Sequence, residues 1–117
     1  MRDYLPSVAD YKRGLQKLDR EKRIAENHRN MLIAHYNAPN HTITATALAQ
    51  EVGYKRFTAV NLQYGTFGKK LREVMNWSGP GQESHIIASF YQDETGEWLW
   101  IMHDNLAQAL KELRWVR

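Results

Sequence analysis

The sequence contains no cysteine, which excludes disulfide bonds and zinc sites built on thiolates. It also lacks an apolar run of the roughly 18 residues that a membrane-spanning helix needs, and its polar start is unlike a signal peptide. Because 43% of the 117 residues are hydrophobic, a folded chain is expected rather than a disordered one. We therefore expect one soluble domain over residues 1–117, located in the cytoplasm and without membrane association.

Charge is distributed unevenly along the chain. Residues 1–75 carry 13 Lys and Arg against 7 Asp and Glu, a net charge of +6, whereas residues 76–117 carry 3 against 6, a net charge of −3. This separation favours a polyanionic partner for the first part. The basic residues between positions 12 and 23 have an equally good alternative interpretation, because interleaved acidic residues are typical of the solvated face of a helix.

The most informative segment is 44–75, which has the pattern of a helix-turn-helix. Thr44 can cap a first helix, and Gly53 can end it in the left-handed conformation that a tight turn requires. Two helices joined by so short a turn cross steeply and expose the outer face of the second, where a recognition helix enters the major groove of DNA. Apolar residues in 57–75 recur at spacings of three and four and form one helical stripe: Val60, Tyr64, Phe67, Leu71 and Val74.

The preceding residues, 7–36, are also predicted to be helical. Ser7 can cap a first helix, and Asp19 can cap a second one that runs to about Tyr36. The pattern does not decide between two helices and one bent helix. Residues 41–43 follow a turn-rich cluster and are predicted to be extended, as a short strand.

A β-hairpin and a last helix are predicted towards the C-terminus. Residues 85–91 and 97–102 are rich in β-branched and aromatic side chains and flank a short turn that ends in glycine. Asp104 can cap a final helix over 104–114. The predicted class is therefore mainly α with a small β-hairpin (α+β), in the arrangement of a winged helix-turn-helix whose wing is 85–102. Acidic residues at the hairpin tip count against contact with phosphate, so the wing either points away from DNA or meets a protein.

The predicted groove-facing surface carries the candidate DNA contacts. Lysines and arginines in the turn and along the second helix are expected to hold phosphates. Asn61 and Gln63 can read adenine through their amides, although Asn61 has the alternative role of bracing the turn internally. Thr58 and Leu62 can meet a thymine methyl group. The expected DNA-binding residues are Tyr54, Lys55, Arg56, Thr58, Asn61, Leu62, Gln63, Lys69, Lys70 and Arg72.

Signals for other chemistry are weak. His28 and His35 lie seven residues apart and have a third histidine, His41, nearby, but they match no zinc motif, so a place in the helical core is the better interpretation. Gly65 and Gly68 lack the spacing of a phosphate-binding loop, and close packing of another backbone or of DNA explains them better. No serine or threonine belongs to a nucleophile signature. We expect no enzyme activity, no metal and no cofactor.

Several motifs in the sequence together resemble a known module. They are Met31-Leu32, His35-Tyr36, Ala38-Pro39, Thr42 to Ala49, Gly53-Tyr54, Ala59-Val60-Asn61, Tyr64-Gly65, Gly68 and Leu71, followed by Gly96 to Met102, Leu106-Ala107, Ala109-Leu110 and Leu113 to Val116. Over about residues 30–117 they resemble the module that precedes the nuclease domain in bacterial HNH-type restriction endonuclease-like proteins. One departure is His103-Asp104, where the module is expected to have Arg-Pro.

This resemblance implies a module of bacterial or phage origin that binds double-stranded DNA and is linked to restriction-modification, phage defence or regulation. It does not imply cleavage, because an HNH site needs a ββα unit with a base histidine, and we expect no such unit after the module. The alternative function is that of a protein-interaction module, such as a small phage-encoded inhibitor of a host defence complex. A homodimer is compatible with DNA binding, since many helix-turn-helix proteins read paired half-sites.

Overall fold

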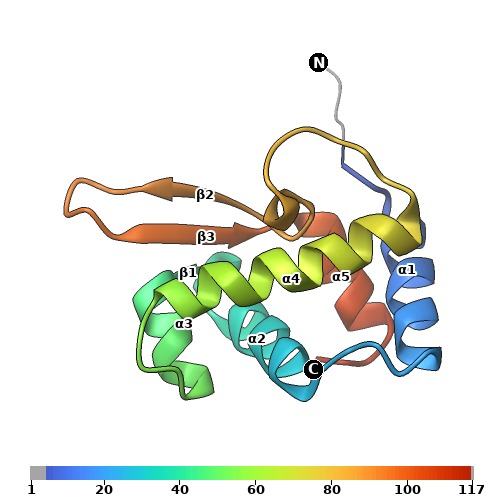
Figure 1. Ribbon diagram of the computed structural model, residues 1–117, viewed down its shortest axis with the longest axis horizontal. Helices are drawn as coiled ribbons and strands as arrows, with labels where there is room; N and C mark the ends of the chain where they lie inside the picture. Colours follow the sequence, from blue (N-terminus) through green and yellow to red (C-terminus); the bar gives the residue numbers. More distant parts are fainter. Residues whose placement is uncertain (1–4, 117) are drawn as a thin grey trace.

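The computed structural model describes residues 5–116, in which the chain is mainly helical and contains one small antiparallel sheet. Its helix α4 runs along one side of the molecule, and the hairpin of β2 and β3 projects beyond the helices (Figure 1). The α-helices are α1 (Val8–Arg20), α2 (Glu26–Asn37), α3 (Ala45–Val52), α4 (Thr58–Met75) and α5 (Asp104–Glu112). The strands are β1 (Thr42–Thr44), β2 (Ala88–Gln92) and β3 (Trp98–Met102), and the short 3-10 helices are η1 (Pro39–His41) and η2 (Glu83–Ile86).

The sheet has the strand order β1-β3-β2, with β3 in the centre. Trp100 of β3 pairs with Ile43 on one side and with Phe90 on the other. The extended segment expected near residue 43 is thus a strand, and it joins the hairpin as its third member. All neighbouring strands are antiparallel.

The first hairpin strand starts later than the sequence pattern predicted. Residues 85 and 86 belong to η2 rather than to a strand, and β2 begins at Ala88. The hydroxyl of Tyr11 donates to the carbonyl oxygen of Ile86 at 2.7 Å, and both side chains are fully buried. The Ile86 carbonyl thus bonds to α1, and pairing with β3 begins two residues further on, at Ala88.

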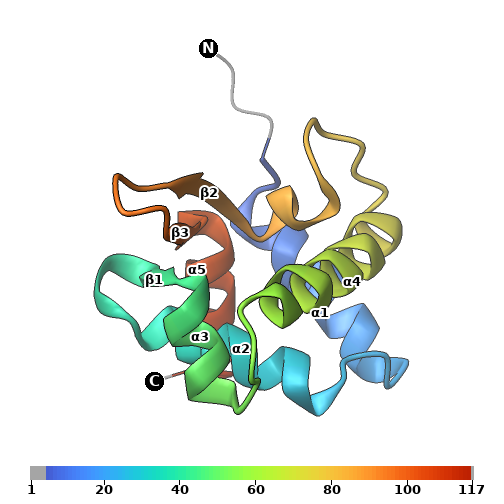
Figure 2. The ribbon, with the colours of Figure 1, turned by 60° about the vertical axis from the view of Figure 1, so that its left-hand side comes forward.

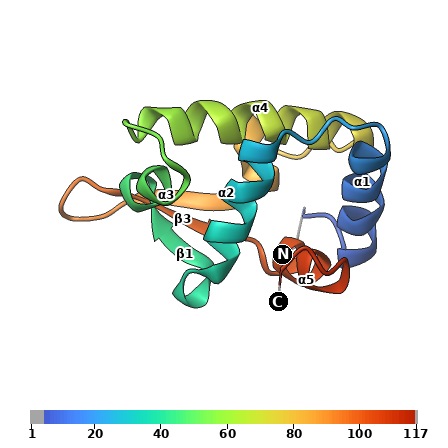
Figure 3. The ribbon, with the colours of Figure 1, turned by 90° about the horizontal axis from the view of Figure 1, so that it is seen from below.

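The N-terminal residues form two separate helices, α1 and α2, which Figure 3 shows joined by a loop. The side chain of Ser7 caps α1 as predicted, accepting from the amide of Asp10 at 3.1 Å. The predicted cap at Asp19 is wrong, because this residue lies inside α1, and α2 begins after Ala25 without a side-chain cap. The buried side chain of Leu18 extends the apolar stripe of α1, which keeps the helix going past residue 19.

Both predicted signals of the helix-turn-helix segment are confirmed. The Thr44 hydroxyl accepts from the amide of Ala47 at 3.0 Å, and Gly53 follows α3 with a φ of 86°. In α4, the first four residues of the predicted stripe are buried, and Val74 is half-buried. α3 and α4 therefore pack through their apolar faces and leave the outer face of α4 open.

The last helix, α5, packs against α1 at the end of the molecule opposite to the hairpin (Figures 1 and 3). Asp104 is its first residue rather than its cap, because His103 occupies the cap position, so this prediction is also wrong. Asp104 still places a carboxylate in the first turn, where the helix dipole favours it. Within residues 5–116, none of the helices combines the length and the hydropathy needed to span a bilayer.

Candidate nucleic-acid interface

The turn between α3 and α4 presents two cations to solvent. Lys55 and Arg56 are exposed, and neither takes part in the salt bridges found among residues 5–116. Figure 2 looks towards the N-terminal end of α4 and shows this turn beside α3. Unpaired cations at such a turn are suited to phosphate groups, because no internal carboxylate has to be displaced.

The outer face of α4 continues this open surface. Thr58, Leu62 and Lys69 lie four and seven residues apart, so they share one stripe, and all three are exposed. Leu62 is 66% exposed, which is unusual for a large apolar side chain, and Phe57 just before the helix is 43% exposed. An exposed stripe of one cation, one hydroxyl and one apolar side chain matches the chemistry expected for a groove-facing helix.

Asn61 lies between this stripe and the hairpin. Its side chain is exposed and lines a hollow of about 210 Å³ together with residues of the loop after α4 and of β2 and β3. The alternative expectation, that Asn61 braces the turn, finds no support, since no hydrogen bond of its side chain is present among the described residues.

Gln63 and Tyr54 take part in internal contacts with α2 instead of lying on the open surface. The Gln63 side-chain oxygen accepts from His28 Nε2 at 2.8 Å and from the Asn27 amide at 3.2 Å. The same Asn27 amide donates to the Tyr54 hydroxyl at 2.6 Å. The acceptor of Gln63 is thus bound to α2 and not directed at the open surface where the sequence predicted a base contact, and Tyr54 braces the turn.

Burial of His28 against α4 keeps its ring neutral. Desolvation lowers the pKa of His28 and is the largest effect, the hydrogen bond with Gln63 opposes it, and the nearby charge of Lys70 lowers the pKa further. A neutral ring donates from Nε2 to Gln63, while Nδ1 has no hydrogen-bond partner within residues 5–116. The α2–α4 contact at this position is thus polar but uncharged.

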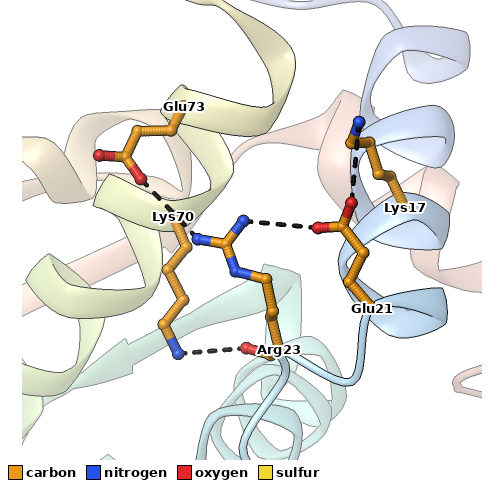
Figure 4. A network of polar contacts seen from close by, with 5 residues as sticks. All are labelled: Lys17, Glu21, Arg23, Lys70 and Glu73. Carbon is orange, nitrogen blue, oxygen red and sulfur yellow. Dashed lines mark hydrogen bonds and ion pairs between the residues drawn. The ribbon is translucent and has the colours of Figure 1, made fainter.

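Lys70 lies on the opposite flank of α4 from Asn61, since nine residues correspond to about 180° around the helix. Its ammonium donates to the carbonyl oxygen of Arg23 at 3.1 Å. Figure 4 shows the surrounding network, in which the Arg23 guanidinium lies 3.5 Å from Glu21 and 3.8 Å from Glu73. Lys70 thus tethers the loop between α1 and α2, on a different side of α4 from the open surface that it was predicted to flank as a phosphate contact.

Arg72 is engaged within the protein, by the segment that follows α4. Its guanidinium donates to five consecutive main-chain carbonyls in the loop that follows α4, those of residues 79–83, at 2.6 to 3.4 Å. The same guanidinium lies over the ring of Trp77, with its carbon 4.7 Å from the ring centroid. Its three nitrogen atoms all bond to this segment, so the structure does not place Arg72 on the open surface where the sequence predicted a phosphate contact.

The acidic hairpin tip has a local structural explanation. The carboxylate of Asp93 accepts from the amide and hydroxyl of Thr95, at 2.9 and 2.6 Å, and from the amide of Glu97 at 3.0 Å. The hydrogen bond from the Thr95 hydroxyl is the main reason why the pKa of Asp93 is lowered. Asp93 thus forms the turn, and the Glu97 carboxylate accepts from Thr46 of α3 at 3.4 Å, which fixes the hairpin to the helices.

The remaining histidines named above are also held by hydrogen bonds. His35 is fully buried, with Nδ1 2.8 Å from the Tyr64 hydroxyl and Nε2 2.9 Å from the Trp100 carbonyl oxygen. His41 Nδ1 lies 2.7 Å from the carbonyl oxygen of Tyr36. No group of three or more metal-ligating side chains occurs within residues 5–116.

Sequence reasoning missed the aromatic wall that faces Asn61 across the hollow. Phe90, Trp98 and Trp100 form this wall, and they share one face of the sheet because Phe90 pairs with Trp100. The alternation of tryptophan at 98 and 100 was a detectable signal, since residues two apart in a strand lie on the same face. Comparison of the chain with protein-family models, with curated proteins and with solved structures found no match.

Proposed function

We propose that this protein is a winged helix-turn-helix module that binds double-stranded DNA, with α4 in the major groove and the β2–β3 hairpin as its wing. The observation that carries the proposal is one continuous exposed surface formed by the turn and the outer face of α4. The residues of this surface are Lys55, Arg56, Thr58, Asn61, Leu62 and Lys69. The strand order β1-β3-β2 supports the winged-helix assignment. The order along the chain also supports it, because α3 and α4 follow β1 and precede the hairpin.

The proposed roles divide into phosphate contacts and base contacts. Lys55, Arg56 and Lys69 hold phosphates, and Asn61 reads a base edge through its amide. The resemblance to the HNH-associated module supports a role for this binding in bacterial or phage restriction, defence or regulation, without cleavage by the chain itself.

Replacing Lys55 and Arg56 together with alanine is expected to weaken binding to random duplex DNA by about tenfold at moderate salt. The slope of log affinity against log salt should become less steep by about 2, because each lost phosphate contact accounts for about 0.9. Fluorescence anisotropy with a labelled duplex at several salt concentrations measures both quantities. Asn61→Ala should leave that slope unchanged and alter the sequences recovered in a binding-site selection.

The matched control replaces Arg20 and Lys111 with alanine. It removes the same charge from exposed positions on α1 and α5, at the other end of the molecule (Figure 1). This variant should bind duplex DNA with the wild-type affinity, and its slope of log affinity against log salt should be nearly that of the wild type. If the turn variant and the control lose affinity equally, DNA is bound by net charge alone and the proposed interface is wrong.

A protein partner is the second candidate, and a groove of about 710 Å³ between α1 and the end of α4 favours it. Arg13, Lys17 and Arg20 line the groove beside apolar side chains such as Val74 and Met75, which suits an acidic segment with apolar residues. A partner of this kind should be captured from a bacterial lysate after nuclease treatment and should be lost with Lys17→Glu and Arg20→Glu. Capture that depends on intact DNA would contradict this function.

A further inference from the structure

The hollow between α4 and the hairpin has the construction of a binding site for a flat ligand. Asn61 lines it from α4, and the other lining residues belong to the loop after α4, to η2 and to the two hairpin strands. Figure 2 shows how these elements are arranged. Its volume of about 210 Å³ is below the roughly 300 to 1,000 Å³ typical of sites for drug-sized ligands. The lining residues are Asn61, Gln82, Ser84, Phe90, Trp98 and Trp100.

Aromatic rings form the hairpin side of this hollow. Phe90 stacks on Trp100 with 4.8 Å between ring centroids, and Trp98 meets Phe90 edge-on at 6.0 Å. Trp100 is 2% exposed, whereas Phe90 and Trp98 are only half-buried and keep part of their surface open. Open aromatic surface next to a cavity is the structure on which bases stack in single-strand-binding proteins.

Hydrogen-bonding groups without partners accompany the rings. No hydrogen bond of the Asn61 amide or of the Ser84 hydroxyl is present among residues 5–116, although Ser84 is buried. The indole N–H of Trp100 is also buried without an acceptor. Buried polar groups normally have partners, so a donor or acceptor on the edge of a heterocycle would complete the hydrogen bonding of Ser84, and the exposed Asn61 amide is free to bond to the same edge.

The lining contains no charged side chain, which favours an uncharged group over a phosphate or a carboxylate as the group that enters it. We propose that the hollow binds a single nucleobase that has left the stack of the DNA contacted by α4. Trp98 stacks on the base, and Asn61 and Ser84 bond to its edge. The inference rests on the proposed DNA-binding function, because the surface of α4 brings the duplex to the rim of the hollow. The protein accordingly prefers duplexes in which one base is already unpaired, since extruding a paired base costs stacking and pairing energy.

The test compares two duplexes of the same sequence, one fully paired and one with a single bulged 2-aminopurine. The protein should bind the bulged duplex about tenfold more tightly, and 2-aminopurine fluorescence should fall further on binding because the base stacks on indole. Trp98→Ala should abolish this preference and the fluorescence change while leaving the affinity for the paired duplex intact. Trp98→Phe retains a flat ring and should keep most of the preference, which separates stacking from a general loss of structure.

The outcomes distinguish this inference from the function on which it rests. The wild-type protein could bind the two duplexes with equal affinity and still show salt-dependent binding. This result overturns the proposal that the hollow binds a base, and it leaves the proposed binding of α4 in the major groove intact. Binding to neither duplex overturns both. Free deoxyribonucleosides that quench the protein's tryptophan fluorescence and abolish the bulge preference at micromolar concentration would assign the hollow to a mononucleoside, and the assignment to a DNA base would then be wrong.

Discussion

Replacing Gly68 with alanine is expected to lower the free energy of unfolding by about 2 to 3 kcal/mol. A Cβ atom at this position would lie 2.3 Å from the carbonyl oxygen of Glu83 and 2.8 Å from its carbonyl carbon. These are backbone atoms of η2, which Arg72 and Tyr11 hold from two sides. The added methyl group therefore forces α4 and η2 apart, and the buried side chains between them lose contact.

Gly65→Ala is the matched control, since it makes the same change three residues earlier in the same helix. A Cβ at this position would meet no atom within 4 Å. Alanine is the better helix former, so this variant should gain about 1 kcal/mol in free energy of unfolding. Urea denaturation followed by tryptophan fluorescence measures both variants. A neutral or stabilising effect of Gly68→Ala would show that α4 and η2 are not in close contact.

The two glycines also show which packing contacts could be predicted from the sequence alone. Close packing of another backbone was expected at both, and the backbone of Glu83 fulfils this expectation at Gly68 only. At Gly65 an added Cβ would meet no atom of the described residues within 4 Å, so packing within residues 5–116 does not require a glycine there. A partner close to the outer face of α4, such as the proposed DNA, would supply a reason for it.

Several features that depend on neighbouring residues were predicted correctly, whereas the local caps expected at Asp19 and Asp104 were not. The caps at Ser7 and Thr44, the left-handed Gly53 and the buried stripe of α4 all involve groups within about one or two helical turns. Their energetics are local, so the residue types at those spacings are sufficient to identify them. The mainly helical class with a small antiparallel sheet followed from the same signals.

Features that depend on distant residues were missed. The segment before β2 forms the 3-10 helix η2, in which a carbonyl bonds to Tyr11, 75 positions away in the sequence. The spacing of apolar residues likewise shows on which side of α4 a side chain lies. It does not show which other element of the fold packs against that side. Gln63 and Lys70 face α2 and the α1–α2 loop, and Arg72 faces its own following loop, so long polar side chains assigned to DNA became internal contacts.

Acidification is expected to destabilise the protein by up to about 3 kcal/mol through His35 alone. Burial lowers the pKa of His35 to about 4, and hydrogen bonds to backbone oppose this effect only in part. In the unfolded chain the pKa is near 6.5, so the unfolded state takes up the proton first as the pH falls. The stabilisation is therefore complete above about pH 6.5 and is lost progressively as the pH falls towards 4.

The hydrogen bonds of His35 explain why the folded state resists this proton. The Trp100 carbonyl oxygen can only accept, so Nε2 carries the hydrogen and Nδ1 accepts from the Tyr64 hydroxyl. Protonation of Nδ1 would direct its N–H at the Tyr64 O–H, so that two donors would face each other. The Tyr64 hydroxyl would then have to turn to the Met31 carbonyl oxygen, which is 3.5 Å away. The alternative hydrogen bond is therefore longer than the one that is lost.

His35→Gln tests this assignment, because an amide can donate to the Trp100 carbonyl oxygen and accept from the Tyr64 hydroxyl but does not titrate in this range. Free energies of unfolding measured by urea denaturation between pH 4 and pH 7.5 should depend less on pH in the variant than in the wild type. The difference in free energy of unfolding between wild type and variant should therefore become smaller as the pH falls. His28→Gln is the comparison, since burial lowers the pKa of His28 in the same direction. If the pH profiles of wild type and His35→Gln run parallel, His35 takes up its proton without unfolding, and the Tyr64–His35–Trp100 chain is not the acid-sensitive element of the core.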